Sequence, residues 1–212
     1  MSILTSKLPV SVEINGREYL LNTDFRVGLK IMEAWEDSEL TEREKQWVML
    51  KLLYPEIPED VAEAYRLALN FLNCGEESTV GSTESEQRRY SFSKDAKYIY
   101  TAILQTHGVD LERVDYLHWW KFQYLFLDLR EDCFFSRLIY YRTQRAKGKL
   151  TKEEAEYCQA IQEILDLPED KNPSAEEAAD EFMVDGNPKD CDLVLIALYP
   201  QATVDYVRQH AK

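Results

Sequence analysis

The sequence predicts a mainly α-helical protein in which an N-terminal β-hairpin packs on a bundle of about six to eight helices. Three observations predict this fold class. Apolar residues recur at the i, i+3, i+4 spacing of helices in several segments. Glycine and proline number only seven each among 212 residues, which is few for an all-β fold that turns often. A single Asn-Gly pair stands between two short alternating runs near the N-terminus.

The hairpin is predicted by the Asn-Gly pair at 15–16, because these residues accept the positive φ angles of a type I′ turn. Closure by two residues pairs Val12 with Tyr19 and Val10 with Leu21 on one face. An isolated hairpin is only marginally stable in water, so we expect this face to lie on the helices that follow.

Three short amphipathic helices are predicted next, over about residues 24–36, 41–54 and 58–75. The first is capped by Asp24 and places Phe25, Leu29 and Met32 toward the core. The second opens at a capping box formed by Thr41 and a glutamate three residues later. In the third, a proline at the start and a glycine at the end mark the expected bounds.

Four more helices are predicted over about residues 93–108, 116–129, 134–146 and 151–167. The second of these is apolar around nearly its whole circumference, which is typical of a central helix or of one half covered by a partner. Its polar exceptions, His118, Lys121 and Asp128, project within one arc at about 100° per residue. We therefore expect His118 and Lys121 to form one hydrated stripe.

The chain is divided by composition into four parts. Residues 1–75 form the hairpin and a helical subdomain, and residues 90–167 form the central helical core. Residues 76–89 are polar and contain one apolar side chain, so we expect a flexible linker. Residues 168–212 form an acidic segment and an apolar C-terminal appendage, with a short helical stretch near 175–182 and a terminal helix from about 203.

Charge is distributed unevenly along the chain. The net charge is −14, and residues 163–192 alone carry eleven acidic and two basic residues. Just before this segment, six cations and no acidic residue occur between 137 and 152. This basic island is explained most simply as a solvated helix end. A self-docking contact with the acidic segment and a surface for an acidic partner are the alternatives.

The sequence contains no recognisable catalytic, cofactor or metal signature. The three histidines are not in a nucleophile context, and the four cysteines stand far apart without a C-x-x-C pair. Phosphate-binding loops and metal-binding motifs are absent. No run approaches the roughly 18 apolar residues of a membrane span. We expect an intracellular, soluble protein that is not an enzyme and binds neither cofactor nor metal.

Two groups of apolar residues are candidates for protein binding. The adjacent rings of Trp119 and Trp120 stand beside a cation, although the apolar density of their helix favours a place in the core. The second group lies in the compact apolar run near the C-terminus and consists of Leu193, Leu195, Ile196, Leu198 and Tyr199. Such a run either returns to the core, binds another protein or pairs with a copy of itself.

The chain resembles the bacteriophage gene-product-fifteen family of tailed phages over roughly residues 10–165. The resemblance is carried by Asn22-Thr23-Asp24-Phe25-Arg26, by Tyr90-x-Phe92-x-x-Asp95-Ala96-x-x-Ile99-Tyr100, by Val109-Asp110-Leu111, by Leu117-His118-Trp119-Trp120-Lys121-Phe122 and by Tyr141-Arg142. It implies a non-enzymatic tail assembly chaperone that acts in the host bacterial cytoplasm. The implied partners are tail proteins, namely the tape-measure protein, the tube protein or both.

Other functions compatible with the sequence are a structural component of the phage tail or neck and, less favoured, an acidic DNA mimic that inhibits a host nuclease. A DNA mimic requires carboxylates spread along one face. In this chain most of the excess of acidic over basic residues falls within residues 163–192. We expect neither nucleic acid nor a membrane as a partner, since the net charge of −14 opposes binding to phosphates.

Overall fold

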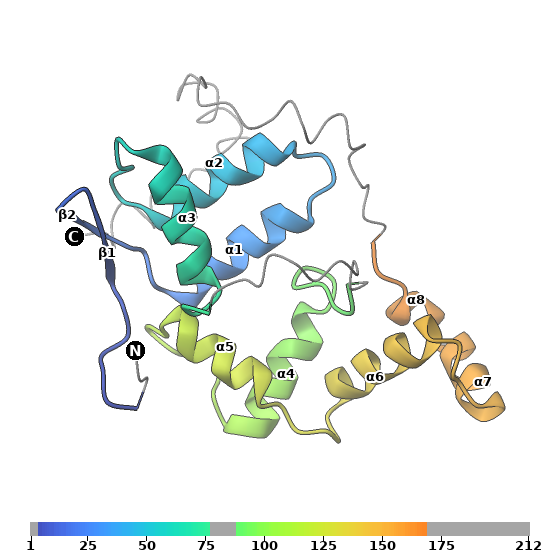
Figure 1. The fold of residues 1–212 in the computed structure, drawn as a ribbon. Helices are drawn as coiled ribbons and strands as arrows, with labels where there is room; N and C mark the ends of the chain where they lie inside the picture. The colour runs from blue at the N-terminus through green and yellow to red at the C-terminus, as the bar shows by residue number, and fades with distance from the viewer. Residues whose placement is uncertain (1–3, 77–87, 169–212) are drawn as a thin grey trace. The chain divides into compact units, whose positions relative to one another are not determined.

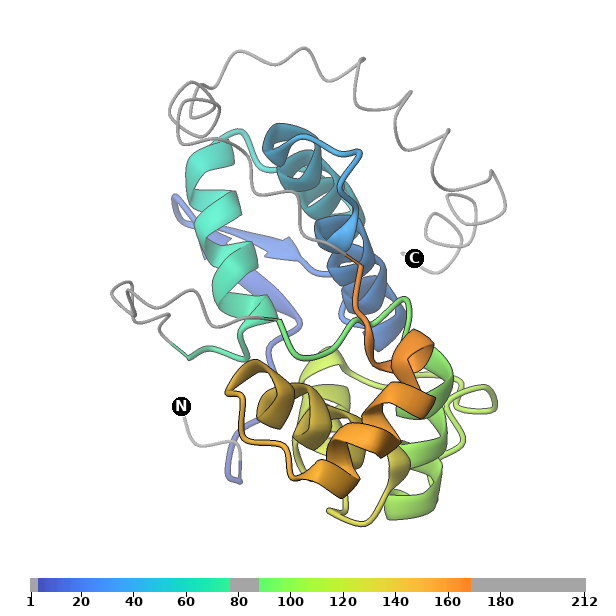
Figure 2. The ribbon, with the colours of Figure 1, turned by 90° about the vertical axis from the view of Figure 1, so that its right-hand side faces the viewer.

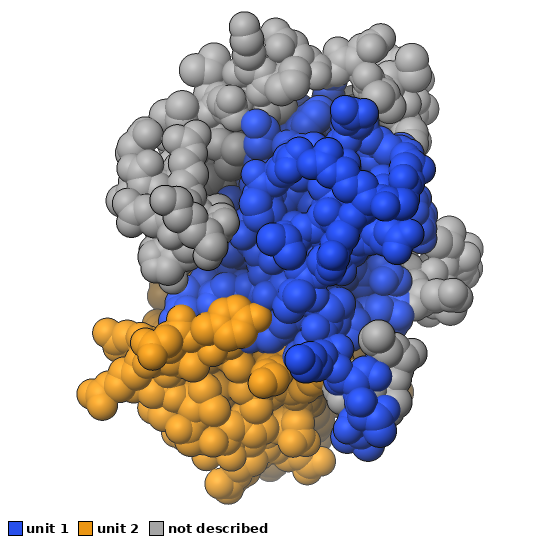
Figure 3. Space-filling view, turned by 90° about the vertical axis from the view of Figure 1, so that its left-hand side faces the viewer, with its two compact units in different colours: residues 1–79, 118–120, 171–212 blue, residues 80–117, 121–170 orange. Residues whose placement is uncertain are grey.

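The computed structural model describes residues 4–76 and 88–168, and the chain divides into two compact units (Figure 3). Of the described residues, unit 1 comprises 4–76 and 118–120, and unit 2 comprises 88–117 and 121–168. The described parts contain one hairpin and eight helices (Figure 1), which confirms the predicted fold class. The predicted linker lies mostly outside the described residues, as does everything predicted after residue 168.

Unit 1 contains the hairpin and the first three helices. Their bounds are β1 (Ser11–Ile14), β2 (Arg17–Leu20), α1 (Phe25–Glu36), α2 (Glu42–Leu53) and α3 (Val61–Leu72). Unit 2 contains α4 (Ala96–His107), α6 (Phe134–Ala146), α7 (Lys152–Ala160) and α8 (Gln162–Leu165). Helix α5 (Trp119–Leu127) begins in unit 1 and continues in unit 2.

The hairpin has the predicted register. Val12 pairs with Tyr19, and the Leu21 amide donates to the Val10 carbonyl at 2.9 Å. Asn15 and Gly16 both have positive φ, 51° and 78°, as a type I′ turn requires. Because the turn consists of only these two residues, its position determines which residues of β1 and β2 pair along the whole hairpin.

The hairpin is held on the helices of unit 1. Ile14 and Tyr19 bury their side chains. Directly after β2, the Asn22 backbone amide donates to the Leu53 carbonyl at 2.8 Å, and its side chain donates to the Leu52 carbonyl at 2.7 Å. These bonds satisfy carbonyls at the C-terminal end of α2 that have no partner within the helix.

Helix α1 begins and ends where predicted, but its buried face is different. Its core side carries Phe25, Val27, Gly28, Ile31 and Ala34. The predicted core residues Leu29 and Met32 are only partly buried. The physical reason is Gly28, whose missing side chain leaves room for the indole of Trp119 against the helix backbone.

The other predicted helix starts were right at both capping boxes and at α6, and too early at α3, α4 and α5, the last of which begins at Trp119 rather than near residue 116. Thr41 and Thr151 cap α2 and α7 in the reciprocal geometry that the sequence indicated. Helix α3 starts later than Pro58, because the Asp60 side chain accepts from the Glu63 amide and so caps the helix. Helix α4 starts after Asp95 rather than at Ser93.

Helices α6, α7 and α8 pack together in unit 2 (Figure 2). The predicted helix from residue 151 is interrupted at Ile161, whose φ of −112° and ψ of 23° end α7 and turn the chain into α8. This turn lets Leu165 join Leu138 and Cys158 in one buried cluster. A second cluster of unit 2 is aromatic and contains Tyr90, Phe92, Phe122, Phe126 and Phe135.

Candidate functional site

The two candidate tryptophans lie inside unit 1. Trp119 is 1% exposed and donates its indole N–H to the Leu72 carbonyl at 2.9 Å. Trp120 is 8% exposed and donates to the Phe71 carbonyl at 2.7 Å. Both rings therefore satisfy carbonyls at the end of α3 while filling the core. Side chains this buried present almost no surface to a partner, and the role of these two residues in protein binding stays a sequence prediction.

The predicted hydrated stripe is wrong at His118, which is 4% exposed, whereas Lys121 and Asp128 are exposed. His118 precedes α5, so the helical geometry of the prediction does not apply to it. Its Nδ1 accepts from the Trp120 amide at 3.1 Å, and Nε2 lies 2.9 Å from the Pro9 carbonyl. These partners assign the neutral tautomer that carries its proton on Nε2.

The other candidate residues, Leu193, Leu195, Ile196, Leu198 and Tyr199, lie outside the described residues. They remain a sequence prediction.

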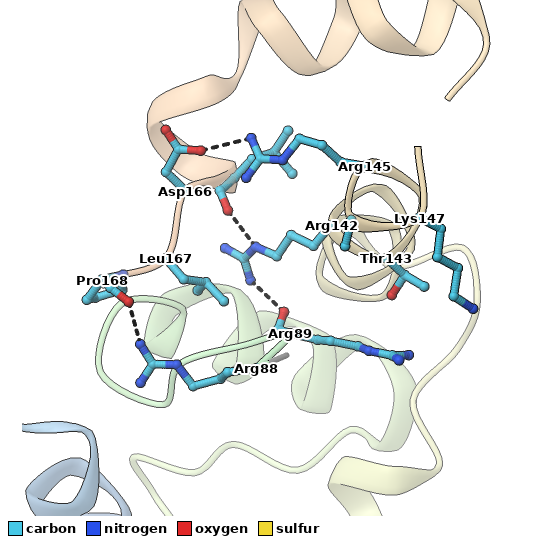
Figure 4. A pocket seen from close by; sticks show the side chains of 11 residues that line it. Arg88, Arg89, Arg142, Thr143, Arg145, Lys147, Asp166, Leu167 and Pro168 are labelled. Carbon is cyan, nitrogen blue, oxygen red and sulfur yellow. Dashed lines mark hydrogen bonds and ion pairs between the residues drawn. The ribbon is translucent and has the colours of Figure 1, made fainter. Parts of the chain in front are cut away.

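A pocket of about 540 Å³ lies in unit 2 (Figure 4). Five of the side chains that line it are cations, and one, Asp166, is a carboxylate. Part of the lining comes from the C-terminal end of α6, where the sequence shows its basic island. The remaining residues come from the chain before α4, from the last residue of α8 and from the chain after α8. The cations are Arg88, Arg89, Arg142, Arg145 and Lys147.

Arg142 forms the buried wall of this pocket. Its guanidinium makes a bidentate ion pair with Asp95, with Nη1 to Oδ2 at 2.6 Å and Nη2 to Oδ1 at 2.9 Å. Three carbonyls accept its remaining N–H groups, those of Leu165 at 2.8 Å, Ile164 at 2.8 Å and Arg89 at 3.2 Å. All five donors of the guanidinium are thereby used. Arg142 therefore joins α6, α8 and the chain before α4.

Arg145 stands at the rim and already binds a carboxylate. Its Nη1 lies 2.8 Å from Oδ1 of Asp166, and the two side chains are 40% and 48% exposed. The Arg145 guanidinium, together with contacts from Gln162 and Lys94, holds the pKa of Asp166 below its usual range. Asp166 is therefore ionised at neutral pH, and the pocket provides a carboxylate-binding cation near the solvent.

Only half of this pocket is predictable from the sequence. The basic island between residues 137 and 152 was apparent, but Arg88 and Arg89 were assigned to a linker and not associated with it. No local signal connects these arginines with α6, because the Arg89 carbonyl meets Arg142 across 53 residues of sequence. Three-dimensional packing alone brings the two cationic segments together.

The histidines and cysteines that the structure describes make hydrogen bonds or are buried within the fold. His107 Nε2 lies 2.8 Å from the Leu125 carbonyl. Cys133 caps α6 by accepting from the Ser136 amide, and Cys158 is buried in the core of unit 2. Burial, with a smaller contribution from Glu76, raises the pKa of the Cys74 thiol to about 12.

Within residues 4–76 and 88–168, His, Cys, Asp and Glu side chains do not gather in threes in a way that could hold a metal ion. In the same ranges, every helix is too short or too polar to cross a membrane.

Comparison with known proteins identifies the family. A family model described as Bacteriophage Gp15 protein matches residues 4–167. This range covers most of the chain, including the hairpin, the described helices and nearly all of the pocket lining. Neither the curated proteins nor the solved structures give a match. The chain therefore belongs to the bacteriophage Gp15 protein family and is a structural or morphogenesis protein of a phage.

Proposed function

We propose that this chain is a non-enzymatic tail assembly chaperone, which binds tail proteins of its phage while the tail is built in the host cytoplasm. The family match over residues 4–167 carries the proposal. The expected partners are the tape-measure protein, the tube protein or both. A chaperone of this kind holds its partner only until assembly is complete, so it needs contacts that form and break readily.

The surface chemistry of unit 2 supports reversible binding. The rim of the pocket carries partly exposed cations, and contacts between exposed charges contribute only about 0–1 kcal/mol each. Charge complementarity of this kind accelerates encounter and gives selectivity without making a complex permanent.

Co-expression with the tube and tape-measure proteins of the same phage tests the proposal. A tag on this chain is expected to co-purify at least one of them, whereas the major capsid protein of the same phage serves as a control and is not retained. Failure to retain either tail protein, with every component folded, contradicts the proposal.

Purified virions distinguish a chaperone from a structural component of the tail or neck, which the same family match also permits. Quantitative mass spectrometry is expected to find this chain absent or scarce in relation to the tube protein. A fixed copy number comparable to that of known tail or neck proteins would establish the structural alternative instead.

A further inference from the structure

We propose that the basic pocket of unit 2 is a binding site for the carboxylates of an acidic segment in a partner protein. The inference rests on the proposed function in one respect: it takes the partner to be a protein. It goes further by assigning the site and the chemistry of the segment that the site recognises.

The first support is local charge. Five cations line the pocket, and two carboxylates oppose them, Asp166 at the rim and Asp95 beneath Arg142. An excess of three positive charges is therefore concentrated in one pocket of a chain whose net charge is −14. The complement of such a pocket is an anion.

The second support is that the cations of the pocket differ in burial and in their existing hydrogen bonds. Arg142 uses all five of its donors inside the protein, so its role is to shape the wall. Arg145 and Lys147 are exposed, and Arg89 is partly exposed. The guanidinium and ammonium groups of these three side chains are the ones that contact the ligand. Figure 4 shows the three residues around the pocket that Arg142 borders.

The third support is that a carboxylate already occupies part of the rim. Asp166 binds Arg145 at 2.8 Å, and both side chains are about half exposed. Exposed pairs of this kind are weak, so an incoming carboxylate readily replaces Asp166 on Arg145. Arginine also matches the planar geometry of a carboxylate with two parallel N–H groups.

A protein segment fits this pocket better than a nucleic acid does. The Debye length at physiological salt is about 8 Å, so a short segment senses mainly the charges of the pocket. A long phosphate backbone extends beyond the pocket, where it gains little, because residues 88–168 as a whole carry thirteen basic and twelve acidic residues. The apolar part of the lining that is open to solvent, Ala146, Leu167 and Pro168, is suited to the methylene groups of glutamate side chains.

A binding assay on the full chain tests the site directly. The probe is a short fluorescein-labelled oligoglutamate peptide followed by fluorescence anisotropy, and an oligoglutamine peptide of equal length is its control. The full chain is expected to bind oligoglutamate saturably, and the Arg89→Glu/Lys147→Glu variant is expected to bind about tenfold more weakly. The matched control is Lys121→Glu/Arg137→Glu, which reverses two exposed cations of the same unit outside the pocket and is expected to bind normally.

Several results would overturn the site. Equal binding of both peptides, or equal loss in both variants, would remove the specific role of the pocket. Tighter binding of an oligothymidine probe would assign it to nucleic acid. Carbodiimide joins a lysine amine to a carboxylate in direct contact with it. Cross-linking of the full chain in the presence of the probe therefore identifies which carboxylate contacts Lys147. A link to an acidic residue of its own chain, in place of the peptide, would also overturn the proposal. Circular dichroism confirms that each variant is folded.

The two proposals fail separately. If tail proteins co-purify but oligoglutamate does not bind, the site is wrong and the chaperone function stands. If oligoglutamate binds the pocket but no tail protein is retained, the anion site stands and the chaperone function is wrong. If both hold, the Arg89→Glu/Lys147→Glu variant is expected to lose the tail protein in the same co-purification.

Discussion

At the scale of single residues, the ion pair between Asp95 and Arg142 contributes most to the organisation of unit 2. The two side chains are 0% and 4% exposed, so both charges are removed from water. Removal of a buried charge from water is costly unless each polar atom finds a partner. Here the carboxylate and three carbonyls together accept from all five donors of Arg142. The pair therefore defines how α6 and α8 meet the chain before α4.

We expect Arg142→Met to destabilise the protein by about 3–5 kcal/mol, because it leaves the Asp95 carboxylate buried without its cation. The measurement is urea unfolding followed by far-UV circular dichroism. Arg137→Met is the control, since Arg137 is exposed on the same helix and its replacement is expected to cost less than about 0.5 kcal/mol. In a double-mutant cycle, Asp95→Asn combined with Arg142→Met is expected to cost less than the sum of the single changes. Additive costs would show that the two side chains are not coupled.

Gly28 has an equally specific role in unit 1. A Cβ atom at this position would lie closer than 3 Å to three atoms of the Trp119 ring, which is nearer than real Cβ contacts come. The close approach of ring and backbone therefore requires glycine.

We expect Gly28→Ala to destabilise unit 1 by about 1–3 kcal/mol, because the ring must move to accept the methyl group. This cost exceeds the gain of about 0.8–1 kcal/mol that alanine brings to a helix interior. The four tryptophans, Trp35, Trp47, Trp119 and Trp120, all belong to unit 1, so their fluorescence follows its unfolding. In the double variant Gly28→Ala/Trp119→Phe, the smaller ring is expected to leave room for the methyl group and so to reduce the loss of stability. A variant more stable than the original chain would contradict the proposed clash.

At the scale of helices and strands, the features that the sequence predicted correctly all depend on short spacings. The Asn-Gly turn and the two capping boxes involve residues one to three apart, and their geometry is determined locally. The helix face of α1 was predicted wrongly because Gly28 and Trp119 meet across 91 residues of sequence. The surroundings of His118 were predicted wrongly because it precedes α5 and its ring bonds the distant Pro9 carbonyl. The pairing of Asp95 with Arg142 spans 47 residues and has no local signal. The pocket depends on this pairing, so only half of it was predictable.

Helix α7 begins at a capping box whose strength depends on pH. The Thr151 amide, and also the Tyr140 hydroxyl, donate to the Glu154 carboxylate and hold its pKa below the usual range. A carboxyl whose pKa is lower in the folded state binds fewer protons there than in the unfolded chain. Its stabilisation is therefore present above the unfolded pKa of about 4.3 and is lost as the pH falls through the folded pKa.

We expect Glu154→Gln to be less stable than the original chain at pH 7, and this difference to shrink as the pH is lowered to about 3. The reason is that protonation makes Glu154 neutral, like glutamine, in both states. Thermal unfolding followed by circular dichroism over this pH range is the measurement. Glu153→Gln is the matched control, because this neighbouring exposed glutamate is not the one that closes the capping box. A difference that grows with acidification would contradict the role of the ionised carboxylate.

At the scale of the whole molecule, charge has two opposite effects. The net charge of −14 makes the chain repel itself, and most of the acidic excess lies outside the pocket. The pocket instead attracts anions over a short range. Salt screens both interactions, so it is expected to strengthen the fold while it weakens binding at the pocket.

We expect sodium chloride, raised from about 50 to about 500 mM, to increase the thermal unfolding temperature by a few degrees at pH 7, because it screens the self-repulsion of the chain. Near pH 5 the net charge is small, since the isoelectric point is about 4.7, and the same salt step is expected to have little effect. Over the same salt range at pH 7, oligoglutamate is expected to bind the pocket progressively more weakly. A fall in the unfolding temperature at pH 7 would show that attractive ion pairs outweigh the net repulsion. Opposite signs for stability and binding instead separate the global charge of the protein from the local charge of its pocket.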